Sequence, residues 1–165
     1  FTKELEPPSS AVIALSANAG SSLTQSLSCG LNCVTDKHLL LESICEFLTS
    51  NDLSNFDKYK SGFIIPGIGH PSIKGEDPRV KYLLEEFSDL AGDKVKFYKR
   101  AEKLLPVHIN IGGAMCSLLL DAGVNKNYVS YFPLIGRMFG WNKTHVYISS
   151  NYPKVKPSAQ IINES

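Results

Sequence analysis

The sequence lacks any apolar run that approaches the about 18 residues needed to cross a membrane. No charged leader followed by an apolar stretch stands at its start, so no secretory signal is visible. An excess of one charge is also missing, because 17 Lys and Arg face 16 Asp and Glu. Balanced charge argues against nucleic-acid binding through bulk electrostatics. We therefore expect a cytoplasmic protein that binds neither a membrane nor nucleic acid.

Cysteine is scarce, with four residues among 165. Cys29 and Cys33 are separated by three residues, but Cys45 and Cys116 do not form a second pair with metal-ligand spacing. We therefore expect no metal site. A disulfide framework is unusual in a chain with this much aliphatic sequence. We expect all four to be reduced thiols, most of them buried.

The chain has enough apolar sequence to bury a core, since 43% of its residues are hydrophobic. Its length fits one domain. We expect a helical domain over residues 1–150 and an extended, proline-containing tail over residues 151–165. Because the chain begins at Phe1 and not at methionine, we also expect that upstream sequence is missing.

Apolar residues recur every three or four positions along most of the chain, which predicts helices. Asp77 followed by Pro78 is typical of a helix start, and Pro106 is expected to end the helix before it. The predicted helices cover about residues 10–31 with a break near Gly20, 36–48 with a cap at Thr35 or Asp36, 77–92, 95–105, 112–123, and 127–141 with a kink at Pro133.

A glycine-rich turn over residues 66–69 is the first candidate site, because glycines let backbone groups approach a ligand closely. His70 closes the turn, and Arg79 lies in the first turn of the following helix, where an anion is favoured. The alternative is a surface loop with a histidine that caps it.

Two further residues are candidates. His38 is expected in the first turn of a helix that begins near Asp36, where the helix dipole keeps an imidazole neutral and able to donate to an enolate. A partly buried structural histidine is an equal alternative. Arg137 stands among apolar residues and needs a carboxylate or phosphate, for which we slightly favour an internal salt bridge. His108 is expected to be structural, and His145 to cap a helix end.

Four stretches carry a family pattern. Residues 66–79, PGIGHPSIKGEDPR, are similar to P-G-x-G-H-x-x-x-K-x-x-D-P-R, which is the most specific match. Residues 109–123, INIGGAMCSLLLDAG, are similar to N-x-D-G followed by LLLD-x-G, and residues 132–141, FPLIGRMFGW, to F-x-x-x-R-x-x-G-W. Residues 30–38 match more loosely. Together they resemble the citrate synthase superfamily, which includes 2-methylcitrate synthases, citryl-CoA lyases and the lyase domain of ATP-citrate lyase.

The resemblance extends over roughly residues 9–145 and implies an all-α, citrate synthase-like helical core, forming a homodimer or a hetero-oligomer. It implies an acyl-CoA thioester and a keto or polycarboxylic acid as ligands, with coenzyme A as substrate or product and no metal. The reaction would be Claisen-type condensation or its reverse. The turn backbone would meet the CoA adenine, through Pro66, Gly67, Ile68 and Gly69.

The resemblance also implies roles for side chains. His38 would hydrogen-bond the thioester enolate, and His70 would bind or protonate the oxygen of the keto acid. Arg79 and Arg137 would hold substrate carboxylates, because a forked guanidinium group fits a carboxylate.

The sequence departs from the family pattern where the chemistry matters most. The catalytic Asp that takes the α-proton of the acyl-CoA falls on Gly112, and Asp121 matches a different position. The two glycines after the first catalytic His are leucines at positions 39–40, and Glu4 or Glu6 occupies the region of an upstream His. Losing a general base removes typically ~10²–10⁴ in rate.

Three hypotheses follow. The chain is a divergent enzyme that works without the usual base, a non-catalytic citrate-synthase-like binding or regulatory subunit, or a purely structural helical domain. The retained histidines and arginines favour the first, Gly112 and the short N-terminus favour the second, and the third is the weakest.

Overall fold

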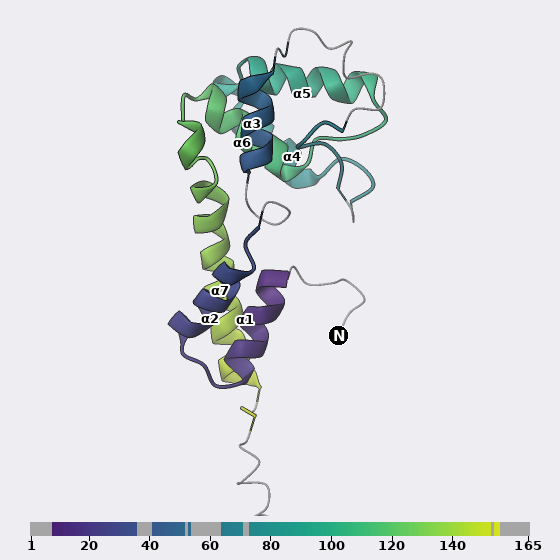
Figure 1. The fold of residues 1–165 in the computed structure, drawn as a ribbon. Helices are drawn as coiled ribbons and strands as arrows, with labels where there is room; N and C mark the ends of the chain where they lie inside the picture. Colours follow the sequence, from purple (N-terminus) through teal and green to yellow (C-terminus); the bar gives the residue numbers. More distant parts are fainter. Residues whose placement is uncertain are drawn as a thin grey trace, which may run out of the picture. The chain divides into compact units, whose positions relative to one another are not determined.

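The computed structural model describes residues 8–35, 41–51, 53, 64–70, 73–152 and 154–155 (Figure 1). Apart from isolated bridges, regular structure in this part of the chain is helical, which confirms the all-α prediction. The α-helices are α1 (Pro8–Asn18), α2 (Leu23–Asn32), α3 (Glu42–Ser50), α4 (Pro78–Glu86), α5 (Asp93–Leu104), α6 (Ile111–Asp121) and α7 (Tyr131–Asn151). Two short 3-10 helices are η2 (Ser88–Leu90) and η3 (Lys126–Tyr128).

The chain forms two compact units, with residues 1–38 and 133–165 in one and residues 39–132 in the other. Helices α1, α2 and nearly all of α7 belong to the first unit, and α3 to α6 belong to the second. None of the helices within the described ranges is long and apolar enough to span a membrane. The division into residues 1–150 and a tail stays a prediction, since residues 156–165 lie outside the described part.

The first unit is organised around two aromatic residues of α7. Trp141 is fully buried, and its Nε1 donates to the Ser9 hydroxyl of α1 (3.3 Å). One turn later, His145 is buried, with its Nδ1 3.0 Å from the Ser26 hydroxyl of α2. His145 is therefore an internal residue that links α7 to α2, and the prediction that it caps a helix end is wrong.

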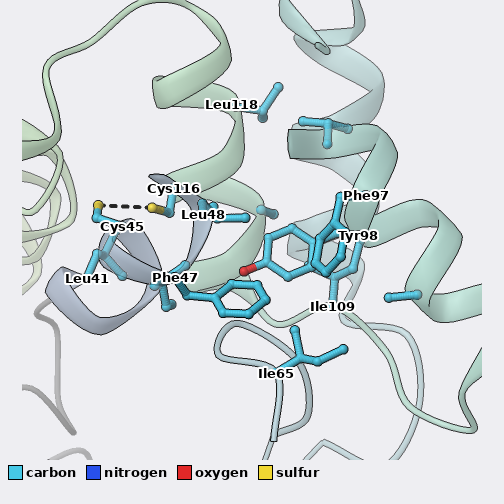
Figure 2. Close-up of a cluster of buried hydrophobic side chains, with 14 of the residues drawn as sticks. Leu41, Cys45, Phe47, Leu48, Ile65, Phe97, Tyr98, Ile109, Cys116 and Leu118 are labelled. Atoms are coloured by element: carbon cyan, nitrogen blue, oxygen red, sulfur yellow. Dashed lines mark hydrogen bonds between the residues drawn. The ribbon is translucent and has the colours of Figure 1, made fainter. Parts of the chain in front are cut away.

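The second unit is built around α6, which packs against α3, α4 and α5. Small and aliphatic side chains of α6 make this possible, because Ala114 and Cys116 are fully buried and Leu118 nearly so. Figure 2 shows the surrounding core, which comes from α3, α5 and the segments that flank the helices: Leu41, Phe47, Leu48, Ile65, Phe97, Tyr98 and Ile109.

All four cysteines are free thiols, as predicted from the sequence. Cys45 and Cys116 are buried in the second unit, whereas Cys29 and Cys33 are only half-buried in the first. The expectation of mostly buried thiols thus holds for two of the four.

Local sequence signals set the helix ends in the second unit. Asp77 is the N-cap of α4, its carboxylate accepts the Arg79 N–H, and Pro78 is the first helical residue, as predicted. Helix α5 ends at Leu104, before Pro106. Helix α6 begins after Asn110, whose side chain accepts the Gly113 N–H.

Two predicted helix boundaries are wrong. Helix α3 begins at Glu42 with Leu41 at its cap position, so neither Thr35 nor Asp36 caps it. Leu41 is buried, and its N–H donates to the Ser130 hydroxyl (3.0 Å), so tertiary contacts replace a capping side chain. Helix α7 continues past residue 141 to Asn151, because Trp141 and the residues after it pack into the first unit.

Candidate functional site

The glycine-rich turn over residues 66–69 is clamped onto the start of α6. Gly67 has a φ of +88°, which an L side chain rarely adopts. Its carbonyl oxygen accepts the Asn110 N–H (3.0 Å), and the Asn110 amide donates to the Gly69 carbonyl oxygen (2.9 Å). The Gly69 N–H donates to the His108 carbonyl oxygen (2.8 Å). Asn110 therefore fixes the turn with one end of its amide and caps α6 with the other.

The turn and α6 approach each other so closely that only glycine fits at the contact. A Cβ added to Gly113 would overlap the carbonyl oxygen of Gly67, and a Cβ added to Gly67 would overlap the Tyr98 hydroxyl. That hydroxyl is buried and donates to the Pro66 carbonyl oxygen (2.6 Å). The contact explains why the sequence has glycines at both places, and it makes the turn rigid.

His70 follows the turn and is exposed. Its Nδ1 accepts the Ile73 N–H (3.1 Å), so the neutral ring carries its proton on Nε2. A hollow of about 150 Å³ opens beside the ring, with Lys74 and His108 also in its lining. Pockets for drug-sized ligands measure about 300–1,000 Å³, so this hollow holds one small group of a ligand and not a whole cofactor.

A second hollow of about 190 Å³ lies between α4 and α5 and shares Asp77 and Ile109 with the first. Its rim carries both acids and lysines. It therefore has no dominant charge that would select a ligand.

Arg79 is engaged by the cap of its own helix. Its Nε lies 2.9 Å from Asp77 Oδ1 and its Nη2 lies 2.6 Å from Oδ2, while its side chain is 57% exposed. One edge of the guanidinium group is thus occupied by a protein carboxylate. Its Nη1 has no partner among the described residues. The other edge of the guanidinium group is therefore open to solvent, and a carboxylate ligand can reach it there.

The Arg79 guanidinium and backbone N–H hold the pKa of Asp77 below its usual value. Because the folded-state pKa is lowered, the stabilisation is fully present above the unfolded-state pKa of about 3.9 and is lost as the pH falls from there through the lower folded-state pKa. We expect Asp77→Asn to lower the free energy of unfolding by about 1–2 kcal/mol at pH 7 and by much less at pH ~2. Urea unfolding at both pH values measures this, with Asp89→Asn, an exposed residue of η2, as the control. A loss that stays constant between the two pH values contradicts the assignment.

Gly112, where the sequence resemblance predicts that a catalytic Asp is replaced, faces apolar side chains. A Cβ there would lie 3.2 Å from Leu41 Cδ2, 3.2 Å from Ile44 Cδ1 and 3.2 Å from Asn110 Oδ1. These contacts are tighter than ordinary van der Waals contact. The room next to the first turn of α6 is therefore largely filled by residues of α3 and its cap.

Two predicted site residues, His38 and Arg137, do not belong to the described part of the second unit that holds His70. His38 lies outside the described residues, and α3 begins at Glu42 and not near Asp36. Arg137 is half-buried in α7 and makes no ion pair with another described residue, so the internal salt bridge stays a prediction. Its neighbours Ile135 and Phe139 are exposed, so water can solvate the guanidinium group.

Sequence reasoning missed two roles that depend on tertiary contacts. Lys74 and His108 line the same hollow as His70. The motif over residues 66–79 contains Lys74, but no motif in the sequence indicates that His108 lies beside it. Asp121 caps a different helix: its carboxylate accepts the N–H groups of Gly92 (2.8 Å), Lys94 (3.2 Å) and Val95 (3.0 Å) at the start of α5. Asp121 is therefore a structural residue. Within the described ranges, no group of three or more His, Cys, Asp or Glu residues is placed to hold a metal ion.

No protein-family model and no curated protein sequence matches this chain. Solved structures do. Citryl-CoA lyase from Hydrogenobacter thermophilus is 21% identical with a TM-score of 0.71, and the match covers 93% of this chain and 66% of that one. Citrate synthase from the thermophilic archaeon Thermoplasma acidophilum, in a ternary complex with carboxymethyl coenzyme A and oxaloacetate, is 18% identical with a TM-score of 0.66. That match covers 94% of this chain and 48% of the other.

The chain thus spans about two thirds of the lyase and about half of the synthase. Likeness at this level of identity concerns the path of the backbone, and it agrees with the helices described above. The chain therefore shares the helical fold of these two structures.

Proposed function

We propose that this chain is a citrate-synthase-like protein that binds an acyl-CoA thioester and a keto or polycarboxylic acid, and that catalyses Claisen-type formation or cleavage of the carbon–carbon bond between them. The clamped turn over residues 66–69, with His70 and its hollow beside it, carries the proposal. The names of the structural neighbours, a citryl-CoA lyase and a citrate synthase with carboxymethyl coenzyme A and oxaloacetate, support the ligand class.

The turn is suited to hold a flat, polar ligand group. Its backbone is fixed by Asn110, Tyr98 and the contact between Gly67 and Gly113, so little conformational entropy is lost on binding. Lys74 adds a positive charge on the same side, which suits the phosphates of coenzyme A. The adenine would meet the turn backbone at Pro66, Gly67, Ile68 and Gly69.

His70 is the residue proposed to act on the acid. With Nδ1 accepting the Ile73 N–H, the neutral ring donates from Nε2, which suits the carbonyl oxygen of a keto acid. Arg79 and Arg137 are proposed to bind carboxylates, and His38 to hydrogen-bond the enolate. Assembly into a homodimer or hetero-oligomer, and a cytoplasmic location, remain expectations.

A non-catalytic binding subunit is the second candidate, and the packing at Gly112 favours it. Glycine has no group that can take the α-proton of the thioester, and Leu41 and Ile44 fill the adjoining space. This candidate keeps the binding of coenzyme A and removes the chemistry.

The test titrates coenzyme A, acetyl-CoA and keto acids into the chain by calorimetry, and then follows free thiol and product masses. For the enzyme, we expect turnover that His70→Ala lowers by roughly 10²-fold or more. His70→Asn is the matched variant, because its amide oxygen still accepts the Ile73 N–H; equal loss in both variants assigns the effect to the imidazole.

Binding without turnover supports the non-catalytic binding subunit. If turnover then appears in Gly112→Asp, the chain lacks only the general base, and the other residues needed for the reaction are in place. Absence of both binding and turnover leaves only a structural domain.

A further inference from the structure

Two buried thiols meet in the second unit, in a contact that the proposed function does not use. Cys45 of α3 and Cys116 of α6 lie with their sulfur atoms 3.1 Å apart, and Figure 2 shows the two side chains directed toward each other. The cysteines are 3% and 0% exposed. A disulfide has a sulfur–sulfur distance of about 2.05 Å, so the two atoms need to approach by only about 1 Å.

We propose that Cys45 and Cys116 are a reversible oxidation site, and that a small peroxide converts them to a disulfide that ties α3 to α6. The proposal does not rest on the proposed function. It rests on the sulfur–sulfur contact between two helices that already pack together, so that the two sulfur atoms are close enough to bond after a small movement.

The two thiols are not equivalent. The hydrogen bond between the two sulfurs lowers the pKa of Cys45, while the same contact and burial raise the pKa of Cys116. Because the thiolate is the nucleophile and Cys45 is also the more exposed of the two (3% against 0%), we assign Cys45 as the sulfur that attacks the oxidant and Cys116 as the one that resolves it.

The step balances with hydrogen peroxide as the oxidant. The Cys45 sulfur attacks one peroxide oxygen, the O–O bond breaks, and the departing hydroxide takes a proton to become water. Cys45 is then a sulfenic acid. The Cys116 sulfur attacks the Cys45 sulfur, the S–O bond breaks, and the hydroxide leaves as a second water with the proton of the Cys116 thiol. Two thiols lose two electrons in total, and the peroxide gains two.

The position of the pair gives oxidation a consequence. Cys116 lies four residues after Gly112 on α6, and Cys45 lies four residues after Leu41, so each shares a helix face with a residue at the contact around position 112. A disulfide would fix the distance between α3 and α6 at this point. It would also close a long loop in the unfolded chain, which raises thermal stability.

The test uses the full chain, and in parallel the variant Cys29→Ser/Cys33→Ser, which keeps only the buried pair. Each is treated with hydrogen peroxide under native conditions, and the products are digested and mapped by mass spectrometry. We expect a peptide that joins Cys45 to Cys116, loss of two thiols, and a rise in Tm of roughly 5–10 °C that dithiothreitol reverses. Cys116→Ser, in which only the resolving thiol is removed, should show neither the cross-link nor the rise.

The proposal is overturned if the full chain, still folded by circular dichroism, oxidises at Cys29 or Cys33 while Cys45 and Cys116 remain reduced. It is also overturned if the cross-link forms only in urea. Both readings come from the natural sequence, so they do not depend on whether any variant folds.

Discussion

Replacing Gly113 by alanine lowers the free energy of unfolding by about 2–3 kcal/mol, although alanine is the better helix former. The added Cβ overlaps the carbonyl oxygen of Gly67, which is backbone and cannot rotate away. The gain in helix propensity, about 1 kcal/mol, offsets only part of this strain. Urea unfolding followed by circular dichroism measures the change.

The matched controls are Gly136→Ala and Gly140→Ala in α7. A Cβ at either position has nothing within 4 Å, so each substitution should stabilise the chain by up to about 1 kcal/mol. The change in the free energy of unfolding therefore has opposite signs at Gly113 and at the two control glycines, although all three lie in helices. If Gly113→Ala stabilises the chain as the controls do, then the turn does not contact α6 as described.

Replacing Asp121 by alanine has an expected cost of about 3–4 kcal/mol. Its side chain is 3% exposed and accepts three backbone N–H groups at the start of α5, and Lys94 lies 3.5 Å away. Removing the carboxylate leaves these donors without a partner away from water. Thermal and urea unfolding measure the loss.

Asp93→Ala is the control for Asp121, because it also removes a carboxylate beside the first turn of α5. Asp93 is 93% exposed and, among the residues that the structure describes, pairs only with Lys96 on the surface, so the expected change is about 0.5 kcal/mol or less. Equal effects of the two substitutions would show that Asp121 does not cap α5.

Local signals in the sequence predicted the part of the fold that local chemistry determines. Asp77 with Pro78 starts α4, and Pro106 follows the end of α5, because a cap and a missing N–H act over one helical turn. The prediction for the start of α3 was wrong because a contact between residues far apart in the sequence determines it. A buried Leu41 held by Ser130, 89 positions away, replaces the polar cap that the sequence offers.

Only the part of the candidate site that is contiguous in the sequence could be predicted. The turn over residues 66–69 and His70 follow from one motif, and the structure adds what holds them: Asn110 and Gly113 from a segment about 40 residues later. The partner of Arg137 stays a prediction, because the apolar residues beside it in the sequence do not indicate which acid the fold brings to α7. The pairing of Cys45 with Cys116 has no signal in their spacing.

Hydrogen–deuterium exchange with and without coenzyme A tests the central claim most directly, because it reads binding and its location together. The account predicts slower exchange concentrated at residues 64–70 and 73–75, weakened when Lys74 is replaced by alanine and unchanged when the exposed Lys103 of α5 is replaced. Unchanged exchange at millimolar coenzyme A, or protection confined to segments away from this turn, would contradict it.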